Sequence, residues 1–235
     1  MKTKALLFLL LICFFNSCTV QFDRNVRIET IGKVVDENNE PIPNTFIGVY
    51  TEAARFSGFY LTSGGDDRFL LGSGTSDEIG DFSIISLFDS NQYFFIFVDG
   101  KELYTDYIYS SNTYEFEPVN FVFNLGQVQL KRNARANISI TRSSLPGTTL
   151  DIIINYESPF CESVFTNGVL NEDLSNCFRT ESIFITLDDD NPDFIKTLSS
   201  FVTGTIEFTY TINGGTETTE TFVINQDNYD INFSY

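Results

Sequence analysis

Clusters of acidic side chains are the groups in this sequence with the clearest chemical potential. Carboxylate oxygens are the ligands that Ca²⁺ prefers, yet no cluster has the spacing or the closing Glu of a twelve-residue calcium loop. Asp and Asn are also frequent in turns, because their side chains hydrogen-bond to nearby backbone groups. We therefore predict turns and no metal site, with calcium kept as a weak alternative at Asp188, Asp190 and Asp193.

Histidine is absent from the 235 residues. The chain thereby lacks the commonest general base and the commonest zinc ligand, which excludes Ser-His-Asp triads, Cys-His dyads and His-based metal centres. A pair of carboxylates could still act as in a glycosidase, but an all-β sequence does not indicate which two acids meet. We predict no catalytic residue, no cofactor and no enzymatic activity, and keep an acid-pair hydrolase as the least favoured alternative.

Two of the four cysteines can pair in the folded protein. Cys13 lies in an apolar N-terminal run and Cys18 lies shortly after its end, which leaves Cys161 and Cys177. In an oxidising compartment outside the cytoplasm an even pair of this kind indicates a disulfide. The alternative is two free, buried thiols.

The N-terminus has the features of an export signal. Lys2 and Lys4 precede the apolar run Ala5–Phe15, which is shorter than the roughly 20 residues needed to span a bilayer. The residues Phe15-Asn16-Ser17-Cys18 resemble the signal of bacterial lipoproteins, with Phe15 and Asn16 departing from the usual pattern. The resemblance implies a signal peptide at 1–17, a lipid on Cys18 and a tether over 18–25. The alternative is an ordinary cysteine beside a cleavage site.

The charge balance limits the partners and the location. Fourteen basic and 32 acidic residues give a net charge of −18, which repels nucleic acid and anionic head groups. We expect attachment to a membrane through the lipid anchor, in the cell envelope and at the outer membrane, with the leaflet left open. The basic cluster 131–135 is interpreted as a linker between two domains, 26–131 and 132–235.

From Val26 onward the residues alternate as in β-structure. We expect one register slip near Gly32, a central strand over 93–98, an edge strand over 104–109, a long loop over 158–180 and a single helical turn over 194–200. A hairpin turn is expected at Gly214-Gly215. The other expected strands cover 26–35, 45–51, 82–88, 119–130, 136–141, 149–156, 183–187, 205–212, 218–224 and 229–235.

Two short motifs indicate the family of the first half. They are Gly32-Lys-Val-Val-Asp36 with Pro41-Ile-Pro-Asn44, and Thr75-Ser-Asp-Glu-Ile-Gly80-Asp-Phe82. Together they resemble the carboxypeptidase regulatory-like domain, a transthyretin-like sandwich common in Bacteroidetes surface proteins, although Glu40 and the long 53–73 segment depart from its pattern. In that family the sandwich accompanies a separate zinc peptidase, so the resemblance implies no activity here. The predicted fold is all-β, with two Ig-like or transthyretin-like β-sandwich domains.

The segment 53–73 is unusually long for a connection in a compact domain, and such segments are commonly functional or disordered. Its aromatic residues could form a binding loop, or could pack on the sandwich as an extra hairpin. We therefore expect an accessory or adhesion-type module that binds an unknown protein or glycan. The alternative is a structural subunit that pairs strand edges, through 104–109 or the C-terminal strand. The candidate binding residues are Phe56, Phe59, Tyr60 and Phe69.

Overall fold

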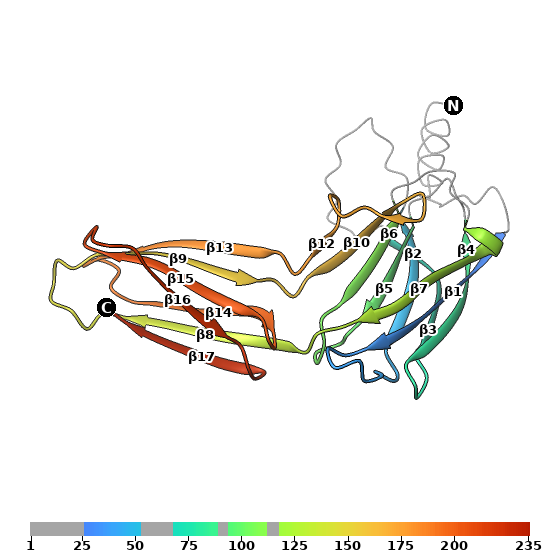
Figure 1. The fold of residues 1–235 in the computed structure, drawn as a ribbon, viewed down its shortest axis with the longest axis horizontal. Coiled ribbons are helices and arrows are strands. Elements are labelled where there is room, and N and C mark those ends of the chain that lie inside the picture. The colour runs from blue at the N-terminus through green and yellow to red at the C-terminus, as the bar shows by residue number, and fades with distance from the viewer. Residues whose placement is uncertain (1–25, 53–67, 89–93, 112–117) are drawn as a thin grey trace, which may run out of the picture.

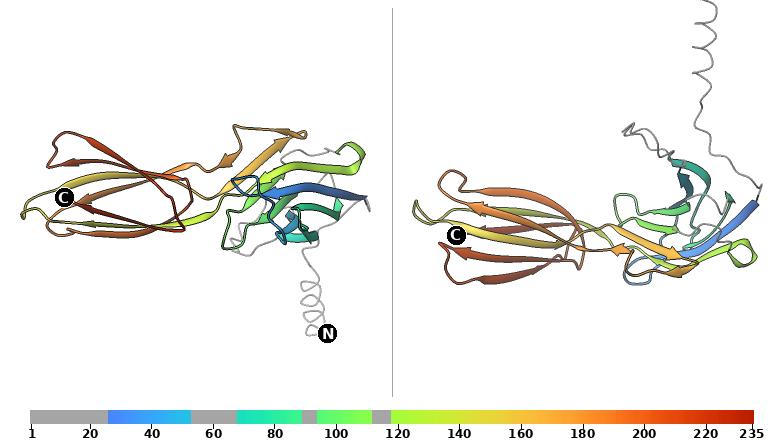
Figure 2. Two further views of the ribbon diagram at one scale, coloured as in Figure 1. Left: turned by 60° about the horizontal axis from the view of Figure 1, so that its bottom comes forward. Right: turned by 90° about the horizontal axis from the view of Figure 1, so that it is seen from above.

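The computed structural model describes residues 26–52, 68–88, 94–111 and 118–235. The fold is all-β, as predicted, and its two halves lie end to end in an elongated molecule (Figures 1 and 2). The N-terminal half contains β1 (Val26–Val35), β2 (Phe46–Glu52), β3 (Arg68–Thr75), β4 (Asp81–Phe88), β5 (Phe94–Asp99), β6 (Tyr107–Ser111), the 3-10 turn η1 (Val119–Phe121) and β7 (Val122–Gln129). The C-terminal half contains β8 (Asn133–Thr141), β9 (Leu150–Glu157), β10 (Cys161–Thr166), β11 (Val169–Leu170), β12 (Asn176–Cys177), β13 (Thr180–Leu187), β14 (Phe194–Phe201), β15 (Thr205–Ile212), β16 (Thr218–Val223) and β17 (Asn228–Ser234).

The N-terminal half is a sandwich of a β4-β1-β7 sheet and a larger sheet that contains β3, β2, β5 and β6 in that order. Alternate residues of β4 and β5 point inward, and in the core between the sheets Ile28, Ile47 and Ile96 are at most 1% exposed. The predicted register slip is confirmed: Ile31 pairs with Asn124, but Lys33 pairs with Gln127.

The residues of the family-like motifs hold two turns against each other. The Asp36 carboxylate accepts hydrogen bonds from the backbone N–H of Asn38 and Glu40, and that of Asp77 does the same for Ile79 and Asp81. Gly80 has φ +82°, and a Cβ there would lie 2.5 Å from the Val34 carbonyl oxygen. A glycine is therefore required where the turns meet, and Phe82 then enters the core.

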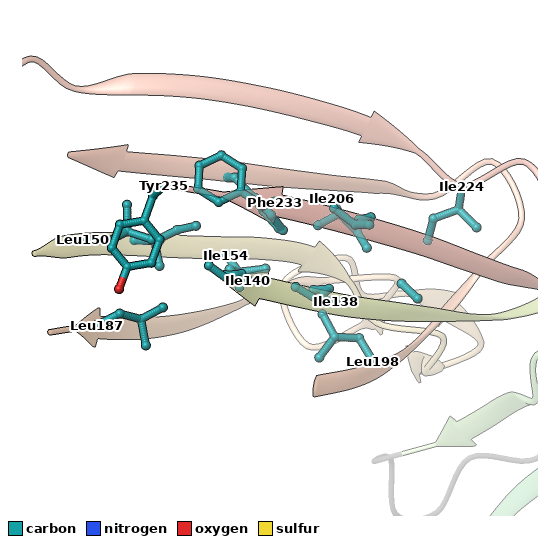
Figure 3. Close-up of a cluster of buried hydrophobic side chains, with 14 of the residues drawn as sticks. Ile138, Ile140, Leu150, Ile154, Leu187, Leu198, Ile206, Ile224, Phe233 and Tyr235 are labelled. Carbon is teal, nitrogen blue, oxygen red and sulfur yellow. The ribbon is translucent and has the colours of Figure 1, made fainter. Parts of the chain in front are cut away.

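The C-terminal half is a second sandwich, made of the sheets β14-β8-β17 and β13-β9-β15-β16. Figure 3 shows its apolar side chains filling the space between the sheets. Ile140, Ile154 and Ile206 are fully buried there. The segment 194–200 is strand β14 and not a helical turn, because Leu198 and Ser200 alternate inward from the sheet. A hairpin joins β15 to β16 as predicted, but its tight turn is centred on Asn213 and Gly214, which both have positive φ, and not on Gly214 and Gly215.

Residues 158–180 were expected to form a loop, but they contain β10 to β12 and the start of β13. Strand β10 leaves the C-terminal half and pairs in parallel with β6 of the N-terminal sheet. The prediction that 104–109 forms an edge is therefore wrong, because β6 lies between β5 and β10. Tyr109 of β6 is 5% exposed and stacks on Phe165 of β10, with 4.3 Å between ring centroids.

The two halves meet around Lys131. Its ammonium nitrogen lies 4.0 Å from the ring centroid of Phe178 and 3.9 Å from that of Phe201, and its backbone N–H donates to the Thr105 hydroxyl. Burial lowers the pKa of Lys131 below its ordinary value, and the neighbouring Glu157 offsets part of this shift. The division at 131/132 stays a prediction, and β10 to β12 extend the N-terminal sheet from beyond it.

Cys18 and the segments 1–17 and 18–25 lie outside the described residues, so the export signal and the lipid anchor stay predictions. Within the part of the chain that the structure covers, no helix is long and apolar enough to cross a membrane.

Candidate functional site

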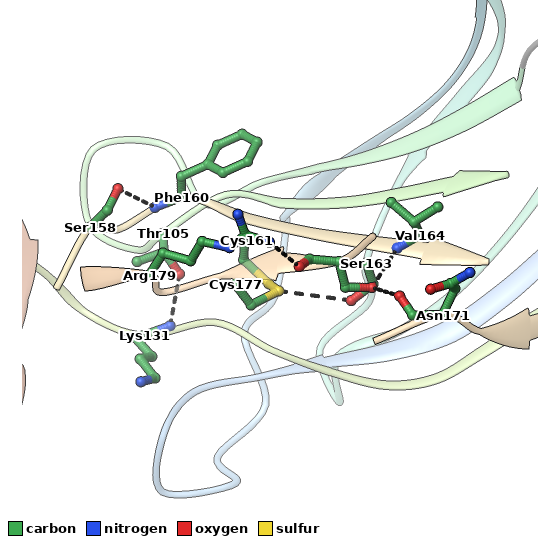
Figure 4. The surroundings of a disulfide bond; sticks show 11 residues. Thr105, Lys131, Ser158, Phe160, Cys161, Ser163, Val164, Asn171, Cys177 and Arg179 are labelled. Atoms are coloured by element: carbon green, nitrogen blue, oxygen red, sulfur yellow. Dashed lines mark hydrogen bonds between the residues drawn. A yellow bond between two sulfur atoms is a disulfide. The ribbon is translucent and has the colours of Figure 1, made fainter. Parts of the chain in front are cut away.

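The predicted disulfide is present between Cys161 and Cys177, which face each other across β10 and β12 with their Cα atoms 3.8 Å apart. Around it, the Val164 backbone N–H donates to the Ser175 hydroxyl, and that hydroxyl donates to the Asn171 carbonyl (Figure 4). The bond joins β10 to β12 at the point where the segment 161–177 leaves the C-terminal half and returns to it. It thereby holds β10 beside β6.

A groove of about 490 Å³ lies on the outer face of the enlarged N-terminal sheet. Ile108 and Ser110 alternate with buried Tyr109, while Glu162 and Val164 alternate with Cys161 and Phe165, which point toward the core. The groove thus combines side chains of both halves on one face. We call it the β6–β10 groove, and its lining residues are Arg68, Phe94, Phe95, Ile108, Ser110, Ser111, Phe160, Glu162, Val164 and Leu174.

Phe95 and Arg68 line one side of the β6–β10 groove, and Phe95 stacks on Tyr50. The rings of Tyr50 and Phe95 are nearly parallel, with centroids 5.1 Å apart, and the Arg68 guanidinium lies 5.2 Å from the Phe95 centroid. Tyr50 can fold down on the sheet because Gly48 has no side chain; a Cβ there would lie 2.4 Å from the Tyr50 ring. Stacked rings beside a cation form a rigid platform. Few side-chain bonds there lose rotational freedom when a ligand binds, so the entropy cost of binding is low.

The opposite side of the groove carries a hydroxyl–carboxylate pair and two exposed apolar side chains. The Ser110 hydroxyl donates to the Glu162 carboxylate at 2.8 Å. Phe160 is 41% and Leu174 51% exposed, and Figure 4 shows the Phe160 ring turned away from the disulfide. Glu162 is the one carboxylate among the described lining residues, whereas glycoside hydrolysis uses two. The described lining thus offers a ligand apolar contacts and one hydroxyl–carboxylate pair.

The tyrosines behind the groove are structural. Burial raises the pKa of Tyr109 far above its ordinary value, and burial also raises that of Tyr107. Neither phenol is ionised at neutral pH, so neither supplies a base to the groove. Their contribution is to seal the sheet from its inner side.

Of the four sequence-predicted binding residues, Phe69 is the one that the structure describes. Phe56, Phe59 and Tyr60 lie outside the described residues. Phe69 is 37% exposed and pairs with Thr51, which is 1% exposed and points inward. Phe69 therefore belongs to the opposite face of the sheet from Tyr50.

The weak calcium candidates serve as turn residues. The Asp188 carboxylate accepts hydrogen bonds from the backbone N–H of Asp190 and Asn191, and the Asp193 carboxylate accepts one from Arg142. Within the described ranges, no group of three or more Asp, Glu, His or Cys residues is placed to hold a metal ion.

The groove could not be identified from the sequence, because its lining residues come from strands that are distant in the chain. A signal did exist in 161–166, where Cys161, Ser163 and Phe165 alternate with Glu162 and Val164. That pattern indicates a strand with two different faces. It does not indicate that the strand joins the sheet of the other half.

No family model matches the sequence, and no curated protein sequence matches it significantly. Among solved structures, the fold is similar to the TIE protein of Bacillus anthracis at 13% identity and a TM-score of 0.31, over 89% of this chain and 34% of that one. A mutant of the shaft pilin SpaA from Lactobacillus rhamnosus GG is similar at 13% identity and a TM-score of 0.31, over 89% of this chain and 98% of the pilin. These likenesses are too weak to carry an inference about function.

Proposed function

We propose that this chain is a lipid-anchored, non-enzymatic binding module of the bacterial cell envelope, and that the β6–β10 groove holds an extended polypeptide segment of its partner. The observation that carries the proposal is the groove itself, an apolar depression on a sheet face to which both halves contribute. Monomeric proteins rarely expose clustered apolar side chains unless the surface binds something.

The composition of the groove favours a polypeptide over other ligands. Ile108, Val164 and Leu174 offer aliphatic surface, which suits apolar side chains better than the hydroxyl-rich edges of a sugar. The net charge of −18 disfavours polyanionic ligands. Glu162 and Arg68 at opposite sides would fix the orientation of a ligand that has both a donor and an acceptor.

Binding of displayed peptide and glycan libraries to the full chain tests the groove. We expect enrichment of peptides with apolar residues, and affinity at least about tenfold lower for Phe160→Ser combined with Leu174→Ser. Leu145→Ser is the matched control, because Leu145 is 81% exposed and lies in the β8–β9 turn, outside the groove. Selective glycan enrichment that depends on Phe160 would make the ligand a glycan. Binding to neither library, or equal loss with the control, would contradict a groove ligand.

The anchor is tested separately by membrane partition and intact mass in the bacterial host. Wild type should sediment with membranes and carry acyl mass on Cys18, whereas Cys18→Ala should do neither, because two or more acyl chains hold a protein on the membrane. A soluble wild type that begins at another residue would contradict the anchor while leaving the groove intact.

A further inference from the structure

Strand β13 is an exposed edge of the C-terminal half. It pairs with β9 on one side and ends its sheet on the other, and Figure 1 draws it along the outer border of that half. Its eight residues stay in register with β9, from Thr180 opposite Glu157 to Leu187 opposite Leu150, without a bulge. The outer side of β13 therefore presents a regular row of backbone donors and acceptors, which is a template for another strand.

This edge lacks the features that normally block strand pairing, namely interior charges, proline and bulges. The one charged residue of β13 is Glu181, near its start, and the carboxylate accepts a hydrogen bond from the Tyr156 hydroxyl. The following segment, 182–187, contains no charge, proline or glycine. The three other edge strands of the same half each carry a charge further inside, on Lys196, Glu220 and Asp230.

The residue types of β13 are symmetric about Phe184, in the order Ser182-Ile183-Phe184-Ile185-Thr186. If two copies pair antiparallel with Phe184 at the centre, each Ile183 faces an Ile185 and each Ser182 faces a Thr186. Aromatic, β-branched and hydroxyl pairs of this kind stabilise antiparallel strands. Glu181 would face Leu187 in this register, so no like charges would be opposed.

The side chain of Phe184 is available for such a contact, because it is 73% exposed. In the sheet it stands beside Ile153 of β9, which in turn pairs with Thr209 of β15. These three residues line a shallow groove of about 380 Å³ on the outer face. A second Phe184 across the edge would extend this row and cover part of both rings.

We propose that the chain forms a two-fold symmetric dimer by antiparallel pairing of β13 with the β13 of a second copy, centred on Phe184. The two four-stranded sheets become one continuous sheet, and the N-terminal halves point in opposite directions. The dimer uses no residue of the β6–β10 groove, so the test of the dimer is independent of the test of the proposed function.

Sedimentation of the full chain over a range of concentrations tests the dimer. Wild type should sediment as a concentration-dependent dimer, and Phe184→Lys should raise the dissociation constant at least about tenfold, because two like charges would face each other at the centre. Ile195→Lys is the matched control: Ile195 is 81% exposed on edge strand β14, and its replacement should leave the dimer unchanged.

Cross-linking tests the register, and does so even if Phe184→Lys perturbs folding. Under mild oxidation, Phe184→Cys should give a peptide that links position 184 to position 184 of the second copy, at least about tenfold more than Val223→Cys gives its own self-link. Val223 is 54% exposed on edge strand β16. A monomeric wild type, an unchanged dimer with Phe184→Lys, or equal self-linking at 184 and 223 would each overturn the proposal.

Discussion

Tyr109 of β6 and Phe165 of β10 stack with 4.3 Å between their ring centroids, and so join the two halves of the chain inside one core. Tyr109 also contacts Phe123 of β7. Strand β10 therefore packs on the core of the N-terminal sandwich, although in the sequence it lies between β9 and β13 of the C-terminal one. The floor of the β6–β10 groove depends on this placement.

Truncation of Phe165 should destabilise the N-terminal half. Phe165→Ala removes a partly buried ring from the core, so we expect a loss of about 2 to 3 kcal/mol in the free energy of unfolding. Val164→Ala is the control, because Val164 points into the groove from the same strand, and it should cost less than about 1 kcal/mol. Urea denaturation measures both values. Equal losses for the two variants would contradict the inward placement of Phe165.

Loss of the disulfide should destabilise the segment that contains β10 to β12. Cys161 and Cys177 are 16 residues apart, and a bond that closes a loop of this size stabilises a protein by about 3 kcal/mol in the chain-entropy model. Cys161→Ser combined with Cys177→Ser should lower the urea midpoint by an amount that reductant reproduces in wild type. Reductant should then leave the double variant unchanged. A wild-type midpoint that does not respond to complete reduction would contradict the prediction.

The turn that contains Gly80 should tolerate no side chain. Gly80→Ala combines a positive φ with a Cβ only 2.5 Å from the Val34 carbonyl oxygen, so we expect a loss of more than about 2 kcal/mol. Gly126 also has a positive φ, of 61°, but a Cβ there meets nothing within 4 Å. Gly126→Ala should thus cost only the conformational strain, about 1 kcal/mol. Thermal unfolding of the two variants separates the effect of the positive φ, which both share, from the effect of the steric clash at Gly80. Equal losses of stability would show that the structure relieves the clash.

Acid should weaken the far end of the C-terminal half through Asp189. Hydrogen bonds from the Gly147 backbone N–H and from Arg142 hold the pKa of this carboxyl below its ordinary value. Because the pKa is lower in the folded state, the stabilisation is complete above about pH 5 and is lost as the pH falls through the folded pKa. Asp189→Asn should remove this part of the acid dependence. An NMR titration that finds a pKa at or above about 3.9 for Asp189 would contradict the account.

Most strands could be predicted from the sequence because each buries one face locally. In 205–212, Ile206 and Phe208 alternate with polar residues, and the strand bounds agree with the expectation. The spacing of Phe194, Leu198 and Phe201 also fits a helix, so the sequence predicts a helical turn over 194–200, where the structure has strand β14. Such ambiguity is inherent in short apolar patterns.

The partners of the strands could not be predicted in the same way. Alternation in 161–166 specifies two faces but not which sheet receives them, since pairing depends on contacts that are remote in sequence. For the same reason, the tyrosines of 104–109 were interpreted as an exposed edge. The groove arises from this pairing, so its position cannot be predicted from the sequence, whereas the disulfide can be predicted from the even cysteine pair combined with the expected export of the chain.

The most direct test of the binding account is photo-crosslinking in the bacterial host, with a benzophenone amino acid placed at position 174 in the groove or at position 145 in the β8–β9 turn. Leu174 and Leu145 are both exposed, at 51% and 81%, so the matched pair controls for accessibility. We expect one discrete cross-linked partner from position 174 that disappears with Phe160→Ser and is absent from position 145. The same products from both positions, or none from position 174 in cells that express the protein fully, would contradict the claim that the β6–β10 groove binds a partner.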